Sequence, residues 1–499
     1  MKHFLALLLS SASLPLCATT YHIAPAGSNA YNGLSLTTAW ATIQHGANAA
    51  VAGDSVVVHQ GDYQGFAAMT NSGSAANPIV FFAELGVQIT SPCNYNNLDG
   101  INVEGVSWVV VEGFTVNDMP RTGIRTALSD HITIRWNNCQ SNYKWGILTG
   151  FAEQVTIEHN SCSGSEDEHG IYVSNSADDP IIRYNHCFDN RSNGIHMNGD
   201  VSLGGDGVIS NAQVHGNIIH GNGVGGGSGI NCDGVINSVF FNNLLYENHA
   251  SGISLYQIDG GAPSTGNRVF NNTMVNASDA RWCVNITEDC TGNQVVNNIL
   301  INQHPWRGSI VVAASALSGF VSDHNIVTPR LSPDGDATIL ALTDWQALGY
   351  DANSAIAAPQ AQLFSAPGID FHALNAAAQQ VNSGTAAAAS VVNDDLDGTF
   401  RPQGGAFDIG CYESLFGATG IAPIAGSAST LTLVSDAVLV QAEEPCLLRA
   451  SDACGRLLME QRVGIGTSRM EFRETGFLLL ELIGAEGERQ LALRALAVR

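Results

Sequence analysis

Residues 132–139 read ITIRWNNC, residues 155–162 read VTIEHNSC and residues 180–187 read PIIRYNHC. In each stretch the residue types alternate as they do in a β-strand, and an asparagine follows. Five later stretches continue the pattern, and aligning all eight places in one column Asn137, Asn160, Asn185, Asn217, Asn243, Asn272, Asn298 and Asn325. Their separations of 23, 25, 32, 26, 29, 26 and 27 residues match one turn of a solenoid. Because the period within each stretch is strand-like, the repeat predicts a parallel β-helix and excludes a helical array.

The asparagine column has a physical reason. Where a coil bends inward, the backbone groups cannot all pair within the sheets. A buried amide has two donors and an acceptor, so it can satisfy these groups and its neighbours in adjacent coils. Low dielectric strengthens such a network only while every member is paired. We therefore interpret the column as a structural ladder and not as a set of ligands.

A second recurring phrase is Gly-Ile followed by alternation, as in WGILTG, HGIYVSN and NGIHMNG. Successive strand side chains point to opposite faces. If the isoleucines point inward, one outward row holds Arg125, Leu148, Tyr172, His196, Asn231 and Ser254. The next outward row holds Ser174, Asn198, Asp233 and Tyr256. These rows are polar and aromatic, unlike a surface that is meant to be buried.

The net charge and the N-terminal sequence indicate where the protein is located and which partners it is expected to lack. The 499 residues carry a formal net charge of −25, which repels nucleic acid, so we expect no nucleic-acid partner. Lys2, the apolar run at 4–9 and the sequence Leu-Cys-Ala at 16–18 predict a signal peptide over residues 1–18. No later segment is long and apolar enough to predict a membrane span. We expect a monomer that is secreted or held at the cell surface.

The cysteines do not suggest a dense disulfide framework. Three recur one coil apart and are expected to be stacked, buried thiols: Cys139, Cys162 and Cys187. Two closer pairs are candidate disulfides in an oxidising compartment: Cys283 with Cys290, and Cys446 with Cys454.

The flanks of the repeat resemble known proteins. YHIAPAGSNAYNG and AWATIQHGANAAVAGDSVVVHQGDY, within residues 19–100, resemble the N-terminal cap and first coils of pectate-lyase-like proteins. Residues 101–328 are the repeats, and NDDLDGTFRPQGGAFDIGCYES, within 329–416, resembles the closing segment of the same superfamily. The resemblance implies an all-β fold, a right-handed parallel β-helix solenoid.

The C-terminal part resembles a different family. After an Ala/Gly/Ser linker at 417–428, residues 429–499 are similar to the sorting domain of type IX secretion cargo. The similarity rests on D-x-x-G-R at 452–456 and on Gly476 before an apolar strand, although the tail ends in arginine where the family commonly has lysine. It implies a small β-sandwich domain with the secretion machinery as partner. The alternative is a β-sandwich that binds carbohydrate or acts as a spacer.

Acid–base side chains fall on adjacent coils of the outward rows. Neighbouring strands lie about 4.8 Å apart, so these side chains can converge on one sugar. Tyrosine and histidine can act as general acid or base in elimination from a uronic acid. We therefore predict as catalytic His196, Asp233, His169 and Tyr172. We predict as substrate-binding Asn198, Asn231, Tyr256 and Arg125.

Long connections at 199–210 and 257–267 are expected to form two walls of a groove over these residues. Nearby carboxylates offer either a calcium site or the paired carboxylates of a glycosidase: Glu166, Asp167, Asp200, Asp206 and Asp233. Calcium is thus the one candidate cofactor, and the acidic run at 394–397 is interpreted as a turn. Lys144 is not assigned, although lysine is a frequent base in β-helix lyases.

The sequence therefore predicts a protein that acts on extracellular polysaccharide, as a polysaccharide lyase or a glycoside hydrolase. The alternative is a non-catalytic surface protein that binds glycans or mediates adhesion. The chain lacks both the Asp-Pro-His-Asp pattern of mannuronan epimerases and the calcium-plus-lysine signature of the familiar pectin lyases. Fold alone does not decide between these activities.

Overall fold

The computed structural model describes residues 18–415 and seven further strands, with gaps between them. Those strands are β40 (Thr430–Val434), β41 (Ala437–Ala442), β42 (Cys446–Asp452), β43 (Leu457–Val463), β44 (Gly466–Glu471), β45 (Gly476–Ile483) and β46 (Arg489–Ala497). The chain divides into two compact units, residues 1–417 and 418–499. Nearly all of the predicted signal peptide and the whole linker lie outside the described residues.

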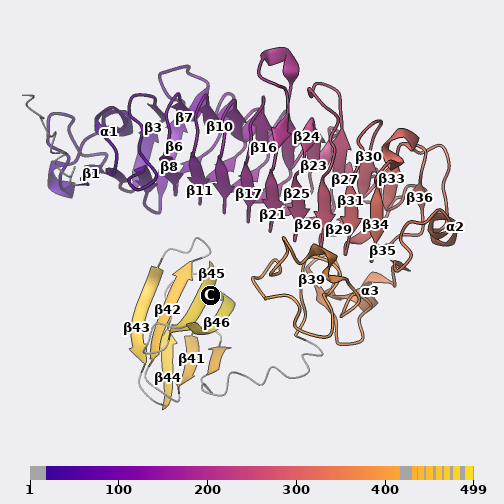
Figure 1. Cartoon of the computed structure of the whole chain (residues 1–499). Helices are drawn as coiled ribbons and strands as arrows, with labels where there is room; N and C mark the ends of the chain where they lie inside the picture. Colours follow the sequence, from indigo (N-terminus) through magenta and orange to yellow (C-terminus); the bar gives the residue numbers. More distant parts are fainter. Residues whose placement is uncertain are drawn as a thin grey trace, which may run out of the picture. The chain divides into compact units, whose positions relative to one another are not determined.

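The first unit is a parallel β-solenoid of about twelve turns (Figure 1). Three sheets run along it, and each regular turn contributes one strand to each sheet in chain order.

Sheet 1 contains β1 (Thr20–Ile23), β2 (Ser55–Val58), β5 (Ile79–Ala83), β8 (Val109–Glu112), β11 (Thr133–Arg135), β14 (Thr156–Glu158), β17 (Ile181–Arg183), β21 (Gln213–His215), β25 (Val239–Phe241), β28 (Arg268–Phe270), β31 (Gln294–Val296) and β34 (Val321–Asp323). Sheet 2 contains β3 (Gly61–Gln64), β6 (Val87–Ser91), β9 (Thr115–Val116), β12 (Asn138–Gln140), β15 (Ser161–Ser163), β18 (His186–Phe188), β22 (Ile218–His220), β26 (Leu244–Tyr246), β29 (Thr273–Asn276), β32 (Ile299–Asn302), β35 (Ile326–Val327) and β37 (Ala355–Ile356). Sheet 3 contains β4 (Phe66–Ala68), β7 (Asp99–Glu104), β10 (Thr122–Ala127), β13 (Trp145–Gly150), β16 (His169–Ser174), β19 (Ile195–Asn198), β23 (Ser228–Asp233), β27 (Ser251–Tyr256), β30 (Val284–Ile286), β33 (Ile310–Val312) and β36 (Leu331–Ser332).

The predicted asparagine ladder is confirmed at the corner between sheets 1 and 2. The side-chain carbonyl of Asn160 accepts hydrogen bonds from the backbone N–H and the amide of Asn137, both at 3.0 Å. Its own amide donates to Asn185 Oδ1 at 3.0 Å and to the carbonyl of Ile134 at 2.9 Å. The same pattern continues to Asn325. Each buried amide thus satisfies the backbone of its own coil and of a neighbour.

A second ladder, which the sequence reasoning missed, lies at the corner between sheets 2 and 3. The amides of Asn190 and Asn222 each donate to the next asparagine along the solenoid, Asn222 and Asn248, at 2.9 and 3.0 Å. Asn142 starts the same column, but Ser165 interrupts it. The residue pair Asn-x₄-Asn in one coil is the sequence signal that identifies both ladders.

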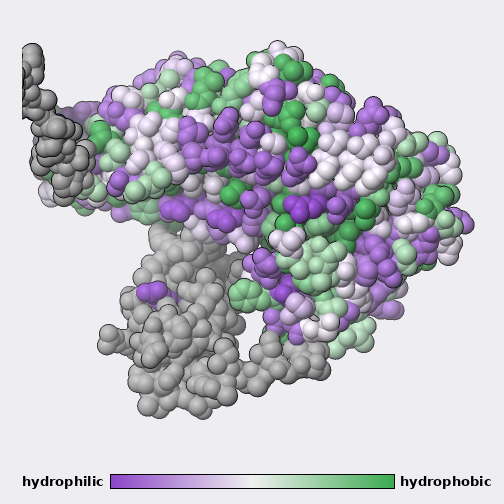
Figure 2. All heavy atoms as spheres, in the orientation of Figure 1, coloured by the Kyte–Doolittle hydropathy of each residue, from purple (hydrophilic) through white to green (hydrophobic). Residues whose placement is uncertain are grey.

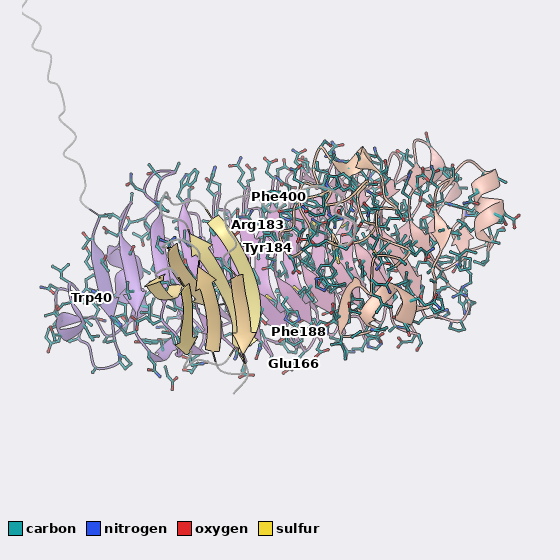
Figure 3. The ribbon with its side chains drawn as sticks, turned by 90° about the horizontal axis from the view of Figure 1, so that it is seen from below. Trp40, Glu166, Arg183, Tyr184, Phe188 and Phe400 are labelled. Carbon is teal, nitrogen blue, oxygen red and sulfur yellow. The ribbon has the colours of Figure 1, made fainter. Side chains whose placement is uncertain are left out.

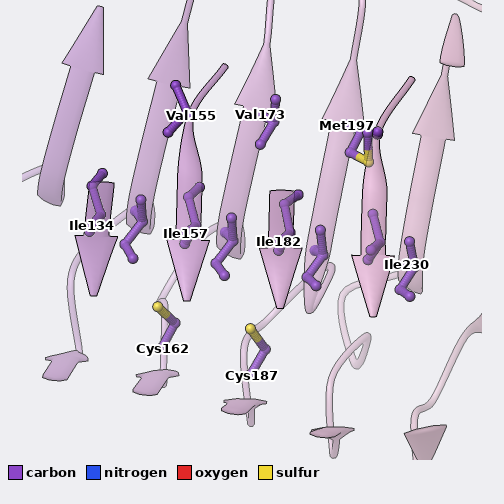
Figure 4. Close-up of a cluster of buried hydrophobic side chains, with 14 of the residues drawn as sticks. Ile134, Val155, Ile157, Cys162, Val173, Ile182, Cys187, Met197 and Ile230 are labelled. Carbon is purple, nitrogen blue, oxygen red and sulfur yellow. The ribbon is translucent and has the colours of Figure 1, made fainter. Parts of the chain in front are cut away.

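The interior is filled by columns of apolar residues, one residue per coil (Figure 4). Ile134, Ile157 and Ile182 form one column. Cys162 and Cys187 belong to another, and with Cys139 they are buried free thiols, as predicted. The predicted disulfide between Cys283 and Cys290 is wrong, because both are free thiols buried in the core. The other predicted pair includes Cys454, which lies outside the described residues.

Both ends of the solenoid are covered. The predicted N-terminal cap contains α1 (Ile43–Ala49), which begins after the N-cap Thr42 and buries Ile43 and Ala47. Trp40 lies beside it at the N-terminal end (Figure 3). At the other end, α2 (Leu342–Ala347) buries Trp345.

A closing segment, residues 355–415, then folds back over sheets 1 and 2. It contains α3 (Gln360–Leu363), β38 (Phe364–Ala366) and β39 (Asp370–Ala373). Four 3₁₀ turns complete the described elements: η1 (Leu36–Thr38), η2 (Val201–Leu203), η3 (Ala314–Leu317) and η4 (Ala386–Ala388). The short strands β20 (Ile209–Ser210) and β24 (Val235–Ile236) form a separate two-stranded sheet. In the chain, each of them follows a strand of sheet 3.

Hydrophilic residues form rows along the middle of the coils (Figure 2). On the outward side of sheet 1, Arg183 pairs with Glu158 at 2.6 Å, and Tyr184 stacks on His159 with ring centroids 5.1 Å apart (Figure 3). Tyr184 and His159 have φ angles of 55° and 56°, because each precedes a ladder asparagine at the corner. The repeating corner therefore aligns outward rings as well as inward amides.

In the second unit the described strands are antiparallel, in the orders β40-β41-β44 and β43-β42-β45-β46. The β-sandwich and its role in sorting stay predictions.

Candidate functional site

Sheet 3 holds the predicted outward rows in register. Tyr172 pairs with His196, and His196 pairs with Asn231 one coil further on. In the next row Asn198 pairs with Asp233, and Asp233 pairs with Tyr256. The inward isoleucines of these strands are fully buried. The chemistry-bearing side chains of four adjacent strands therefore share one outward face.

Two histidines and a tyrosine form a hydrogen-bonded chain across this face. His169 Nε2 lies 2.9 Å from His196 Nδ1. The other nitrogen of that second ring, His196 Nε2, lies 3.3 Å from the hydroxyl of Tyr256. The same hydroxyl accepts a hydrogen bond from the Asn231 amide at 2.7 Å. We call these four residues the His–Tyr chain.

A backbone donor fixes the protons of the His–Tyr chain. The N–H of Asn193 points at His169 Nδ1 at 3.3 Å, and its side-chain amide lies 3.1 Å from the same atom. That nitrogen must therefore accept, so the proton of His169 is on Nε2 and is donated to His196 Nδ1. The proton of His196 is then on Nε2 and is donated to Tyr256. The phenol oxygen receives two hydrogen bonds, which leaves its own proton available for a ligand.

Burial keeps the histidines neutral. Desolvation, aided by the His196 and Lys144 charges, holds the pKa of His169 well below its ordinary value. Desolvation lowers the pKa of His196 to about 3. Burial and, next, the charge of Asp233 raise the pKa of Tyr256 above its usual range. At neutral pH this arrangement offers a protonated phenol supported by neutral imidazoles.

Tyr172 packs against the same chain. Its ring stacks on His196 with centroids 4.9 Å apart, and its hydroxyl accepts a hydrogen bond from Asn198 Nδ2 at 3.3 Å. Burial raises the pKa of Tyr172 to about 12, so it too is a neutral phenol. Two phenol groups therefore flank His196 on the outward face.

Lys144 is occupied by carboxylates. Its ammonium donates to Glu168 Oε1 at 2.5 Å and lies 3.7 Å from Asp167 Oδ2. The other Glu168 oxygen accepts from the Trp145 indole at 2.9 Å and lies 3.6 Å from His169 Nε2. The pair with Glu168 raises the pKa of Lys144, which makes this lysine a fixed cation at the edge of the site.

The loop at 257–267 covers the side chain of Asp233, which is therefore not open to solvent. It is 1 % exposed, and its carboxylate accepts hydrogen bonds from the backbone N–H groups of residues 258, 259 and 260 at 2.8–3.0 Å. Its oxygens are committed to the connection at 257–267. Asp233 therefore has no oxygen free to act on a substrate, which argues against its predicted catalytic role.

The prediction of two separate walls is wrong. The connection at 199–210, which projects above β24 in Figure 1, bonds directly to the connection at 257–267. The N–H of Val201 donates to the carbonyl of Asp259 at 3.0 Å, and the N–H of Gly261 donates to the carbonyl of Gly207 at 2.6 Å. The two connections form one joint wall over Asp233, so the His–Tyr chain lies beside this wall and not between two.

Other predicted contributors lie apart. Arg125 is three coils from His196 and is bound to Glu104 and Asn102, both at 2.6 Å. Asp200 caps its own turn by accepting from Ser202. In the part of the chain that the structure describes, no group of three or more His, Cys, Asp or Glu residues could hold a metal ion. The turn prediction for 394–397 fits Asp395, whose carboxylate accepts backbone N–H bonds from residues 397, 399 and 413.

Comparison with known proteins agrees with this architecture. A family model described as "Right handed beta helix region" matches residues 99–269. The crystal structure of pectate lyase Pel9A is similar with a TM-score of 0.54 and 16% identity, over 79% of this chain and 96% of that one. The predicted right-handed, pectate-lyase-like β-helix fold is therefore confirmed.

More distant likeness extends to a rhamnogalacturonan lyase, with a TM-score of 0.41 and 13% identity over 56% of this chain and 82% of that one. The periplasmic alginate epimerase AlgG matches with a TM-score of 0.38 and 14% identity, over 54% of this chain and 76% of that one. No curated protein matches the sequence. Across the described residues, no helix has the length and apolar character to cross a membrane.

Proposed function

We propose that this protein cleaves extracellular polysaccharide on the outward face of sheet 3, with Tyr256 as the proton donor to the departing sugar oxygen. The observation that carries the proposal is the His–Tyr chain. Its protons are ordered by the Asn193 N–H so that the free proton is the phenol proton of Tyr256. When Tyr256 gives up this proton, the Nε2 proton of His196 already points at the phenol oxygen and stabilises the developing negative charge.

The side chains at the site favour elimination over hydrolysis by paired carboxylates. A glycosidase needs two available carboxyl groups that flank the scissile bond. Here Asp233 is committed to loop N–H groups, and Glu168 is committed to Lys144 and Trp145. Elimination from a uronic acid instead needs proton transfers. A water molecule at the site takes the C5 proton, the C5 electron pair forms the C4–C5 double bond as the C4–O bond breaks, and Tyr256 gives its proton to the departing oxygen and regains one from solvent. We therefore assign the reaction class as polysaccharide lyase.

Activity is tested by incubating the protein with plant and algal polysaccharides, with and without a calcium chelator. Elimination produces unsaturated ends that absorb ultraviolet light, whereas hydrolysis produces reducing ends without that absorbance. Tyr256→Phe should lower kcat by about 10²–10⁴-fold, the usual contribution of general acid–base catalysis. Tyr31→Phe, at an exposed tyrosine near the N-terminal end of the solenoid, is the matched control.

Two outcomes contradict this assignment. Reducing ends without ultraviolet absorbance would show a hydrolase. Binding of polysaccharide without any product would show the non-catalytic glycan-binding function.

The location is part of the same proposal. Residues 1–18 act as an export signal, and residues 429–499 form a β-sandwich that directs the protein to the cell surface through the secretion machinery. Residues outside the β-helix are then dispensable for catalysis. Deleting residues 418–499 should leave the protein inside the cell envelope with unchanged kcat in cell extracts. Surface display of the deleted protein would contradict the sorting role.

A further inference from the structure

A pocket of about 300 Å³ opens on sheet 3 beyond the His–Tyr chain. It is formed around β27, β30 and β33 and by the connection after β36. The residues that matter chemically are Arg281, Trp282, Asn285, Glu288, Arg307 and Asp336. Nothing in the reaction proposed above uses this pocket.

Several polar groups of the pocket lack partners. Trp282 is 3 % exposed, and its indole N–H has no acceptor in the described residues. Asp336 has a buried, unpartnered Oδ1 and a φ angle of 85°, a strained conformation for a residue other than glycine. Strain and unsatisfied buried groups concentrate at binding sites, where a ligand completes the hydrogen bonding.

The pocket also contains two uncommitted cations. Among the described residues, neither Arg281 nor Arg307 forms an ion pair. The guanidinium of Arg307 lies 4.4 Å above the ring of Trp306, which holds it in place. The two arginines balance the two carboxylates of the pocket, Glu288 and Asp336, so the pocket is locally neutral in a chain with 20 Lys and Arg against 45 Asp and Glu.

A polar row joins the pocket to the His–Tyr chain. Asn285 follows Ser254 in the outward row, and its amide lies 3.5 Å from Ser254 Oγ. Ser254 is bonded to Ser228 at 2.8 Å, and Ser228 to Asn231 at 3.2 Å. Because Asn285 lies on the strand next to that of Tyr256, the pocket begins about 5–10 Å along the sheet from the phenol.

We propose that this pocket is a subsite for a sugar residue that carries an anionic group, next to the sugar at Tyr256. Arg281 and Arg307 bind the anion, since guanidinium groups pair well with carboxylate and sulfate oxygens. Asp336 accepts from a sugar hydroxyl, and the buried Trp282 lies behind it in the side of the pocket. The subsite rests on the proposed function and specifies the substrate as an acidic polysaccharide. It also explains how a protein of net charge −25 holds a polyanion.

Binding is measured separately from turnover, by calorimetry on the full chain with Tyr256→Phe. The probes are oligogalacturonate for a carboxylate, a sulfated galactan oligosaccharide for a sulfate ester, and a neutral galactan oligosaccharide. The double variant Arg281→Gln/Arg307→Gln should weaken binding of the preferred anionic probe by at least about tenfold, as expected for lost charge-assisted bonds. Binding of the neutral probe should be unchanged. Arg268→Gln, on sheet 1, is the control.

The outcomes separate the two proposals. Equal affinity of the double variant and its parent for both anionic probes would overturn the subsite, and so would failure of the parent to bind either of them. A tenfold loss supports the subsite, and the better-bound anionic probe identifies carboxylate or sulfate. If that loss is found but the wild-type chain forms no product, the subsite stands and the proposed catalysis is wrong.

Discussion

Asn160 shows what a single residue does for the solenoid. Its amide closes hydrogen bonds to Asn137, Asn185 and the backbone of residues 134 and 158. Asn160→Leu has nearly the same volume but leaves these buried groups without partners. Since each unsatisfied buried group costs about 1–3 kcal/mol, we expect a loss of at least about 3 kcal/mol in the free energy of unfolding.

Denaturant unfolding followed by circular dichroism measures this loss. Ser161→Ala, one residue further along and directed outward, should change stability by less than about 0.5 kcal/mol. A Leu variant as stable as the wild type would show that the amides contribute little beyond filling space.

The buried histidines predict an acid-sensitive fold. An unfolded histidine has a pKa of about 6.5, whereas the pKa of His196 is about 3 in the folded protein. Between these values the unfolded state binds more protons, so stability must fall as pH is lowered from about 6.5 toward 3. The fall in Tm between pH 7 and pH 4.5 should be smaller for His196→Gln than for the wild type. His45→Gln, in α1, should keep the wild-type slope, and equal slopes in all three proteins would contradict neutral burial of His196.

At the scale of an element, Asp233 organises the joint wall. Three loop N–H groups converge on one buried carboxylate, and hydrogen bonds to charged groups are the strong ones. Asp233→Ala should release the connection at 257–267, making it a site of limited proteolysis and lowering the proposed lyase activity by about tenfold. Asp259→Ala changes an exposed side chain of the same loop and should be neutral. Protease resistance in Asp233→Ala would show that other contacts hold the wall.

The closing segment depends on a buried ion pair. Arg401 bonds to Glu413 at 3.0 Å, with both side chains fully buried, and to the carbonyl of Gly410 at 2.8 Å. Arg401→Met leaves a buried carboxylate without its partner, so we expect a loss of about 3–5 kcal/mol. Arg183→Met breaks the half-exposed pair with Glu158 and should cost at most about 1 kcal/mol. Similar losses, measured by denaturant titration, would contradict the special role of burial.

Regular elements were predictable from the sequence because the coil imposes a period. Once Asn160 and Ile171 are assigned to corner and core, the outward position of Tyr172 follows from strand alternation. The wall was not predictable, since connections have no period and nothing local tells that the N–H of Val201 bonds to the carbonyl of Asp259. The sequence also could not show which histidine nitrogens carry protons, because this depends on the backbone N–H of Asn193.

At the scale of the whole molecule, the solenoid is stabilised by contacts between neighbouring turns. Repulsion between charges on distant turns is therefore a separate contribution to the free energy of unfolding. A net charge of −25 makes the folded chain repel itself. Surface ion pairs such as Arg135–Glu112, at 2.7 Å, oppose this repulsion only weakly because both side chains are partly exposed.

Added salt should therefore stabilise the fold. Between about 0.01 M and 0.15 M the screening length falls from about 30 Å to about 8 Å, which removes repulsion between distant turns but leaves buried pairs intact. We expect the Tm from scanning calorimetry at neutral pH to rise by several degrees over this range. The same addition at pH 4.5, where protonation has lowered the net negative charge, should raise Tm by less. A Tm that falls with salt at neutral pH would mean that the surface ion pairs, and not the overall charge, dominate the electrostatics of the molecule.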